Sequence, residues 1–402
     1  MKSLKELFRI GPGPSSSHTL GPQRAARMFQ KETRFATRYE AVLFGSLALT
    51  GKGHQSDTII KAVFSPIPCD VHFQIGEDLK HPNTMKLTAF DKENQVLDTW
   101  TIYSIGGGAI EIEGKVLKEG KEVYPHHTFK EIIQYCKEHN LHLYEYVDCF
   151  EQVDDYLLEI LLQMCRTVDN GLNQQGLLPG KLKLERIARK LLDKANACTS
   201  LMEREKLLLS AYAYSASEEN AAGGMVVTAP TLGSSGVLPA LLYYYYYDCK
   251  YQREELLKGL KIAGLFGNLI KQNATISGAQ GGCQAEIGAA CAMAAAMVAY
   301  LRGLNEKQIE CAAEMGIEHH LGLTCDPVGG YVMIPCIERN AVAALRAMDS
   351  AVLAEFISQV KENRVSFDMV VNTMGNTGKQ MPMELRETSL GGLALVVPVS
   401  EC

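Results

Sequence analysis

The sequence predicts an α+β domain over residues 1–124, followed by an all-helical domain over residues 125–402. From residue 39 to about residue 116, β-branched and aromatic residues gather in short runs separated by polar or Gly- and Pro-containing turns, which is typical of strands. Beyond residue 128, apolar residues recur at every third or fourth position, the spacing of helices that bury one face. A chain of 402 residues has room for two such domains and a large core.

The first domain is expected to begin with a short amphipathic helix, followed by a helix over residues 22–29. A buried strand over residues 39–50 then ends at the turn Gly51-Lys52-Gly53, and another helix is expected after this turn. Three further strands follow, with the sequences CDVHFQI, TMKLTAF and VLDTWTIYSI. The triplet at residues 106–108, all glycine, indicates a turn or a bulge near a sheet end.

Eight segments of the second domain carry helical spacing, and several are rich in alanine and glycine, as in QAEIGAACAMAAAMVAYL. Small residues allow helices to approach closely, so we expect a central helical bundle. The boundary between the domains falls near residues 124–128, where Pro125-His126-His127 separates the last strand from the first helix.

Composition excludes several classes of protein. The chain is 47% hydrophobic and 21% charged, as in soluble globular proteins. Its net charge is -6 without a basic tract, so nucleic acid is not expected as a partner. The N-terminus lacks the features of a signal peptide, and the Ala-rich run at residues 287–301 is too short for a membrane span. We therefore expect a cytoplasmic protein without membrane contact.

Twelve cysteines occur without any CxxC pair, which argues against a disulfide framework, a zinc ribbon or a thioredoxin-like site. Most of them, including Cys291 and Cys311 within helical runs, are expected to be buried apolar residues.

Two irregular segments of the first domain concentrate polar groups suited to a small ligand. The segment GPGPSSSHTLGP presents, just before a helix, the residues Ser15, Ser16, Ser17, His18 and Thr19. Hydroxyls and backbone N–H groups at a helix N-terminus suit a carboxylate or phosphate, although a serine-rich capping loop has the same composition. The segment LTGKGHQSD delivers Lys52 and His54 at the end of the predicted strand. Its spacing does not match a Walker phosphate loop, and a solvated turn is the alternative for His54.

In the second domain, residues 219–239 combine glycines with hydroxyl groups and Asn220, so this backbone can approach a small ligand closely. Tight helix packing is the alternative, and it explains the glycines but not the polar groups.

Three cysteines, Cys283, Cys325 and Cys336, lie beside glycine or proline in irregular backbone. Cys283 starts the Ala-rich helix, a position that lowers a thiol's pKa and favours metal ligation. Three thiolates from loops around one bundle could hold an iron–sulfur cluster with one iron left open. Zinc bound by cysteine together with His319 or His320 fits the same spacing, so both readings stay open.

Taken together, the motifs resemble those of the iron–sulfur-dependent L-serine dehydratases (L-serine ammonia-lyases), in the single-chain arrangement. The matching segments extend from residue 11 to residue 341 and are GPGPSSSHTLGP, GSLALTGKGHQSD, SEENAAGG, TAPTLGSSGVLPA, GGCQAEIGAACAMAAA and EHHLGLTCDPVGGYVMIPCIERNA. The resemblance implies a first domain related to the allosteric substrate-binding domains of some phosphoglycerate dehydrogenases. It also implies a helical catalytic domain with a [4Fe-4S] cluster, and a homodimer. It places the cluster ligands on Cys283, Cys325 and Cys336, and the active-site histidine on His54.

The reaction that the resemblance implies removes water from L-serine and yields pyruvate and ammonia. The chain has no Ser-x-Lys loop of the kind that pyridoxal phosphate dehydratases use, so that cofactor is not expected. An open iron would act as a Lewis acid on the β-hydroxyl, and His54 would take the Cα proton. The serine-rich loop with His18 would bind the carboxylate or assist the leaving group, and Lys52 and Asn220 are further candidates for substrate contacts.

Two further features concern the cluster that the resemblance implies. The sequence GSSG at residues 233–236 stands where some relatives have a cysteine, which rules out a fourth thiolate from that loop. Cys402 ends the chain after an apolar run, and the resemblance suggests that it occupies the open iron until substrate displaces it; a frayed tail is the alternative.

No regulatory domain is appended to the chain, so the sequence leaves allosteric control open. Two other classes of protein also stay open. One is a zinc-dependent hydrolase that uses His319, His320, Cys325 and Cys336. The other is a non-catalytic amino-acid binder that uses the first domain alone.

Overall fold

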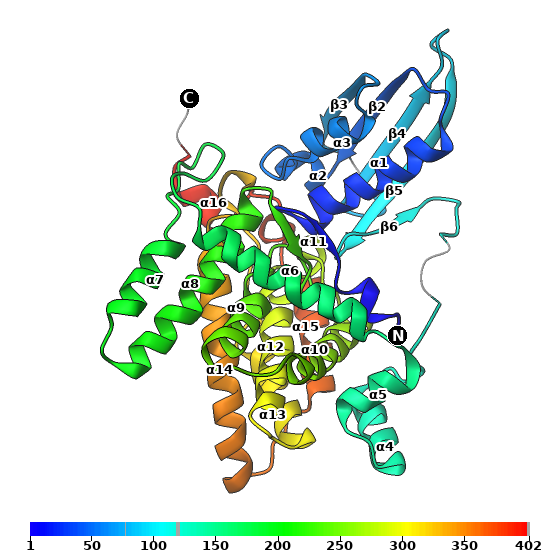
Figure 1. Ribbon diagram of the computed structural model, residues 1–402. Helices are drawn as coiled ribbons and strands as arrows, with labels where there is room; N and C mark the ends of the chain where they lie inside the picture. Colours follow the sequence, from blue (N-terminus) through cyan, green and yellow to red (C-terminus); the bar gives the residue numbers. More distant parts are fainter. Residues whose placement is uncertain (77, 118–120, 400–402) are drawn as a thin grey trace.

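The computed structural model describes residues 1–76, 78–117 and 121–399 of the chain. A region built on a mixed sheet lies beside a much larger helical body (Figure 1). This confirms a sheet-containing N-terminal region followed by a largely helical one, while the exact division at residue 124 stays a prediction.

A five-stranded sheet, in the order β3-β2-β4-β5-β6, forms the centre of the N-terminal region. β2 and β3 are parallel, and the other neighbours are antiparallel. The strands are β2 (Arg38–Phe44), β3 (Cys69–Gln74), β4 (Thr84–Phe90), β5 (Val96–Gly106) and β6 (Ala109–Ile112). Alternate residues of β2 are buried with α1 (Gly21–Glu32) and α3 (Ser56–Phe64) in one core, and these two helices cover one face of the sheet (Figure 1).

The strand predicted over residues 39–50 is wrong beyond Phe44. Gly45 has a φ of +57°, a left-handed backbone that favours glycine, and it ends the strand. A Cβ atom at this position would also clash with the carbonyl oxygen of Pro82. The residues that follow form the short helix α2 (Ser46–Thr50), so Lys52 and His54 come after a helix and not at a strand end.

The first twelve residues pack with the helical body. In place of the predicted amphipathic helix there is a single 3₁₀ turn, Leu4–Glu6, and Leu4, Leu7 and Phe8 are buried in the main helical core. β1 (Ile10–Pro12) pairs antiparallel with β7 (Met225–Val227), which lies far along the chain. The chain therefore leaves the helical body just before the serine-rich loop.

The central helix of the body is α12 (Ile287–Leu301), in which every residue except Tyr300 is buried. The helices that pack around it include α9 (Val237–Tyr243), α10 (Arg253–Asn273), α13 (Glu306–Glu318) and α14 (Cys336–Val360). A Cβ atom on Gly316 of α13 would lie 2.8 Å from Cα of Ala292, so glycine permits the close helix approach that the sequence predicts. By length and composition alone the stretch Cys283–Leu301 is apolar enough to cross a membrane, but 89% of its most apolar window is buried inside the protein.

The remaining helices complete the body and are α4 (Phe129–His139), α5 (Leu143–Phe150), α6 (Asp154–Leu172), α7 (Ala188–Ala197), α8 (Leu201–Ala221), α11 (Gly278–Gly281), α15 (Phe367–Gln380) and α16 (Leu393–Val396). Glu218 of α8 caps α7, because its Oε1 accepts hydrogen bonds from the backbone N–H groups of Ile187 (2.7 Å) and Ala188 (3.2 Å). Burial raises the pKa of Glu218 to about 7, since the charged form loses its hydration.

The buried carboxyl group of Glu218 makes the stability of the protein depend on pH. The folded protein holds the Glu218 proton more tightly than the unfolded chain, so the free energy of unfolding falls as pH rises from about 4.5 to about 7. Glu218→Gln should remove this contribution, which is on the order of 3 kcal/mol. Urea unfolding followed by far-UV circular dichroism at pH 5 and pH 8 measures it, with the exposed Glu362→Gln as the control. Equal pH dependence in Glu218→Gln and the unmodified protein would contradict this assignment.

Candidate active site

Segments from both regions meet at one small cavity with an empty volume of about 390 Å³. The N-terminal region contributes Pro14, Ser15 and His54. The helical body contributes Gly233, Cys283, Glu286, Ile287, Cys325, Pro327, Val332, Cys336 and Glu387. The cavity therefore lies between the polar loops of the first region and the cysteines of the second.

Three buried thiols enter this cavity from three backbone settings. Cys283 begins a 3₁₀ turn that leads into α12, and Cys336 is the first residue of the 25-residue helix α14. Cys325 lies in a loop. Its backbone N–H donates to the carbonyl of Leu385 (2.8 Å), and its carbonyl accepts from the N–H of Glu387 (2.7 Å). All three are free cysteines.

Two polar side chains of α14 hold the thiol loops in place. Asn340, one turn after Cys336, donates from Nδ2 to the carbonyls of Cys336 (2.9 Å) and Gly233 (2.8 Å). Its neighbour Arg339 donates to the carbonyl of Thr324 (2.6 Å), next to Cys325. Both residues lie in the motif quoted above, but their roles appear only once the loops are placed around the helix.

The three thiols together fit an iron–sulfur cluster. A hydrogen bond with Cys325 and the nearby Arg339 guanidinium lower the pKa of Cys283. The same hydrogen bond and burial raise the pKa of Cys325, and burial raises that of Cys336. The protein's own groups thus favour only one thiolate, and holding three requires added positive charge of the kind metal ions supply. No other cysteine among the described residues lines the cavity.

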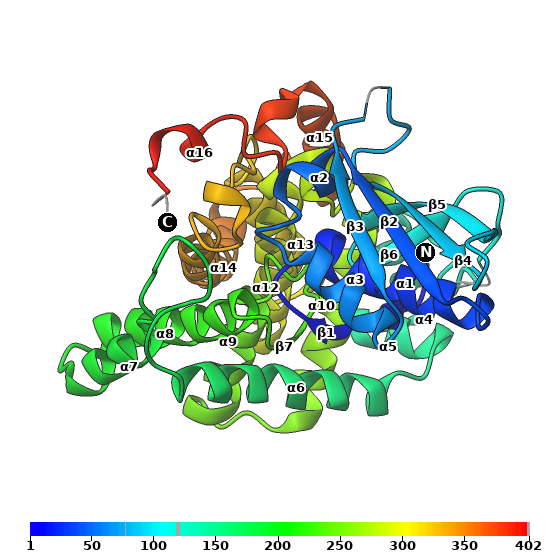
Figure 2. The ribbon, with the colours of Figure 1, turned by 90° about the horizontal axis from the view of Figure 1, so that it is seen from above.

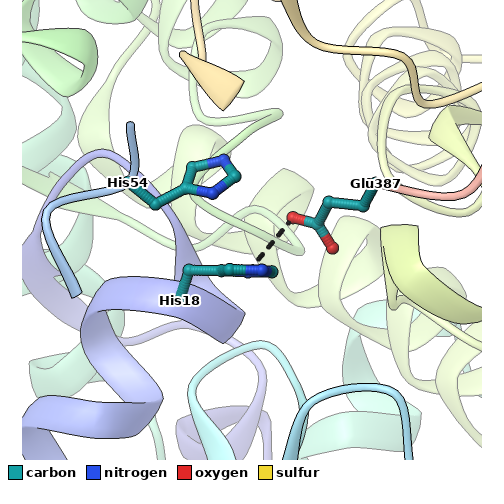
Figure 3. Close-up of side chains that lie close together, drawn as sticks. All are labelled: His18, His54 and Glu387. Atoms are coloured by element: carbon teal, nitrogen blue, oxygen red, sulfur yellow. Dashed lines mark ion pairs between the residues drawn. The ribbon is translucent and has the colours of Figure 1, made fainter. Parts of the chain in front are cut away.

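His18, His54 and Glu387 form a second buried group at this cavity (Figure 3). The two histidine rings lie 4.4 Å apart between centroids, and Nδ1 of His18 lies 3.4 Å from Oε1 of Glu387. Burial lowers the pKa of His18 to about 4 and lowers that of His54 well below its ordinary value. Burial also raises the pKa of Glu387. All three shifts favour the neutral forms, so the His18–Glu387 contact is not an ion pair near pH 7.

The hydroxyl groups around His18 determine its tautomer. Oγ of Ser46 donates its single hydrogen to the carbonyl of Glu387 (2.6 Å), so it can only accept from Nε2 of His18 (3.1 Å). The neutral ring therefore keeps its lone pair on Nδ1, which lies 2.8 Å from Oγ of Ser17. Ser17 and Glu387 link this nitrogen to the cavity, as a chain of groups that can pass a proton.

The residues of the serine-rich loop have two roles: one lines the cavity, and others hold the loop in place by hydrogen bonds. Ser15 lines the cavity, whereas Oγ of Ser16 accepts from the N–H of Leu232 (2.7 Å) and so ties the loop to the GSSG segment. Thr19 donates its hydroxyl to the carbonyl of His54 (2.7 Å) and accepts from the N–H of Ser15 (3.2 Å). Thr19 therefore positions two of the three cavity residues that this region supplies, Ser15 and His54.

Several predicted residues are not brought to the cavity. Asn220 donates from Nδ2 to the carbonyl of Pro14 (2.9 Å), so it supports the serine-rich loop from behind. Lys52 is exposed, with its ammonium group 5.6 Å from the ring centroid of Phe73. Cys402 lies outside the described residues.

The two adjacent histidines near the C-terminus of α13 also stay away from the thiols. Nδ1 of His319 and Nδ1 of His320 hydrogen-bond to carbonyls of α13, those of Met315 (2.9 Å) and Gly316 (2.7 Å). Neither histidine lines the thiol cavity. The mixed Cys/His zinc site that the sequence left open is therefore not formed by the described residues.

Two carboxyl groups of the cavity, Glu286 and Glu387, are absent from the predicted site. Glu286 follows Cys283 by three residues and accepts from Oγ1 of Thr231 (2.7 Å); its closeness to a predicted ligand is the signal that identifies it. Glu387 has no such signal, because only the fold brings it to the cavity. Its φ of +59° is uncommon outside glycine, and such backbones gather at functional sites. Its Oε2 is buried without a hydrogen-bond partner in the described part of the chain.

The chain is similar to known proteins over nearly its whole length. Residues 47–394 match the family described as serine dehydratase alpha chain, and residues 3–67 match the family described as serine dehydratase beta chain. The chain is 39% identical to the L-serine dehydratase of Streptomyces coelicolor, over 100% of this chain and 99% of the relative. It is 36% identical to the L-serine dehydratase of Haemophilus influenzae and 37% identical to L-serine dehydratase 2 of Escherichia coli, each over 99% of both chains. The first family match contains the three thiols, and the second contains the serine-rich loop.

Replacing Cys283, Cys325 or Cys336 singly by serine should remove most of the iron and sulfide bound after anaerobic purification. Each substitution takes away one of the three thiolates that the cavity offers. Metal and sulfide analysis with visible absorption measures the loss, and Cys149→Ser, at an exposed cysteine away from the cavity, is the control. Full iron content in all three variants would show that these thiols do not hold the cluster.

Proposed function

The chain belongs to the L-serine dehydratase family, and we propose that it eliminates water from L-serine at the cavity between its two regions, giving pyruvate and ammonia. The observation that carries this proposal is the convergence of three buried thiols with His54 and Glu387 on one cavity, with His18 directly behind these two residues. The relatives described above are L-serine dehydratases, and both family matches include residues of the cavity.

Cys283, Cys325 and Cys336 are proposed to hold an iron–sulfur cluster of the [4Fe-4S] type. When bound, a cluster with one open iron supplies a Lewis acid for the substrate hydroxyl, which is otherwise a poor leaving group. Pyridoxal phosphate has no role in the proposal. Lys379, in the segment GNTGKQ, is exposed on α15 and does not line the cavity.

His54 is proposed as the base that takes the Cα proton. Its ring lines the cavity, and its Nδ1 is buried without a partner among the described residues. The bond from Thr19 to its carbonyl and the neighbouring ring of His18 fix its orientation. Because burial lowers its pKa, the neutral form that can accept a proton predominates near pH 7.

The remaining polar groups are proposed to bind the substrate and manage the leaving group. Ser15 lines the cavity and caps the start of the helical segment that continues into α1, a position suited to the carboxylate. Glu286 also lines the cavity, and its carboxyl oxygens suit the α-ammonium group. Glu387, which burial keeps protonated and which lies beside Ser17 and His18, can give its proton to the departing hydroxyl.

Further properties are proposed at the level of the whole protein. The N-terminal region is proposed to be akin to the allosteric substrate-binding domains of phosphoglycerate dehydrogenases. The protein is proposed to be cytoplasmic, with neither nucleic acid nor a membrane as partner. A homodimer is proposed, and an apolar face on α14 supports it, where Leu353, Phe356 and Val360 are 47%, 57% and 82% exposed at helical spacing.

Anaerobic purification tests the function directly. The protein should be brown, contain iron and sulfide, form pyruvate from L-serine and lose activity in air. L-threonine and D-serine, assayed in parallel, define its selectivity. A colourless protein with stoichiometric zinc would contradict the proposal, and serine binding without pyruvate would indicate an amino-acid binder instead.

His54→Asn should lower kcat by about 10²–10⁴-fold, the usual contribution of a well-placed general base, while iron and sulfide content stay unchanged. The measurement combines steady-state pyruvate formation with metal analysis of the same preparation. Lys52→Gln, two residues away but exposed, should keep wild-type kinetics. Wild-type kcat in His54→Asn would exclude His54 as the base.

A further inference from the structure

A second and larger cleft, with an empty volume of about 1610 Å³, lies beside the catalytic cavity. One wall is α2 with the loop between β3 and β4, and the other is formed by the end of α10, α11 and α15. Figure 2 shows α2 and α15 at the same edge of the molecule. Amide side chains are frequent in this cleft, among them Asn273, Gln280, Asn372 and Asn376. Such a lining suits a small polar ligand.

The charged groups of this cleft favour an anion. Its charged lining residues, in the part of the chain that is described, are Asp78, Lys379 and Arg386. Nε of Arg386 is buried without a hydrogen-bond partner among the described residues, and Nη1 makes only a long bond of 3.4 Å to the carbonyl of Gln280. A half-buried guanidinium that lacks a carboxylate loses hydration without compensation. A carboxylate ligand, bound in the two-pronged manner typical of arginine, would supply it.

Arg386 also lies at the wall between the two cavities. Arg386 and Thr388 line the cleft, whereas Glu387 between them lines the catalytic cavity. The backbone on both sides of Arg386 pairs with Cys325. Ser46 lines the cleft as well, and its hydroxyl bonds both the carbonyl of Glu387 and the ring of His18. A ligand bound to Arg386 is therefore linked to the thiols through the pairing with Cys325, and to His18 through Ser46.

We propose that this cleft binds a small carboxylate, of the size of an amino acid or a 2-oxo acid, through Arg386, and that this binding holds Glu387 and the Cys325 loop in their active arrangement. Lys379 attracts the anion at the mouth of the cleft, and the amide groups supply hydrogen bonds. Asp78 distinguishes the two kinds of carboxylate, because it attracts the ammonium group of an amino acid, which a 2-oxo acid lacks. The effect on catalysis rests on the proposed function, whereas the binding does not.

Methionine-methyl NMR of the holoenzyme tests the binding, since Met383 lines the cleft. Pyruvate and glycine are titrated separately, and Met383→Leu assigns the signal. Asn376→Asp places a carboxylate in the cleft, on an exposed position of α15 where the fold is retained. This variant should weaken binding about ten- to hundred-fold, and Arg386→Gln should do the same. Thr373→Asp adds the same charge to the exposed side of α15 outside the cleft and should leave binding unchanged.

A saturable shift of the Met383 signal that is weakened in Asn376→Asp supports the proposal, and the ligand that produces it identifies a 2-oxo acid or an amino acid. No saturable shift with either compound, or the same affinity in Asn376→Asp, would overturn it. For the effect on catalysis, the bound compound should change the KM for L-serine in the wild type and lose this effect in Asn376→Asp. An equal response in both proteins would overturn the coupling. The NMR titration requires no turnover, so its failure is distinguishable from failure of the proposed function.

Discussion

The backbone pairing between Cys325 and residues 385–387 is the constraint on which the site depends. Two hydrogen bonds, of 2.8 Å and 2.7 Å, join a thiol loop in the middle of the helical body to a segment close to the C-terminus. They place Glu387 beside the thiols on one side and beside His18 on the other. Ser46, from the N-terminal region, bonds to the same carbonyl of Glu387. A single short pairing therefore sets the relative position of the thiols, the carboxyl group and both histidines.

Burial gives this arrangement its chemical character. His18, His54 and Glu387 have almost no exposure to solvent, and the physical cost of charging them there favours neutral forms. Neutral histidines keep lone pairs, and a neutral carboxyl group keeps a proton, so the groups can exchange protons without bulk water. The hydroxyls of Ser17, Thr19 and Ser46 give these groups fixed orientations at little electrostatic cost. The protein thus combines preorganised neutral groups with thiols that require metal charge.

Local sequence was sufficient for the elements and for the thiols, but not for the complete site. Period-two and period-three-to-four patterns predicted most strands and helices, and irregular backbone beside glycine or proline identified Cys283, Cys325 and Cys336. The strand prediction beyond Phe44 failed because SLALT is apolar enough for either structure, and the left-handed Gly45 decided between them. Glu387 was out of reach, since its role comes from a pairing across sixty residues and not from its neighbours. Lys52 was predicted as a substrate contact from its place in a loop. That place does not determine where a side chain points, and the ammonium group of Lys52 lies near the ring of Phe73.

The pairing of β1 with β7, together with the late position of Glu387, has a consequence for how the protein is made. Pro14 and Glu387 stand near opposite ends of the chain yet line the same cavity, so the site is built from contacts of very large sequence separation. Such contacts form slowly and only after the whole chain is available. During synthesis, β1 can pair only after β7 has been made, and the loop of Cys325 can pair only after residues 385–387 have been made. Because Cys325 is held by residues 385–387, the cavity is complete only once these residues have been synthesised and have paired.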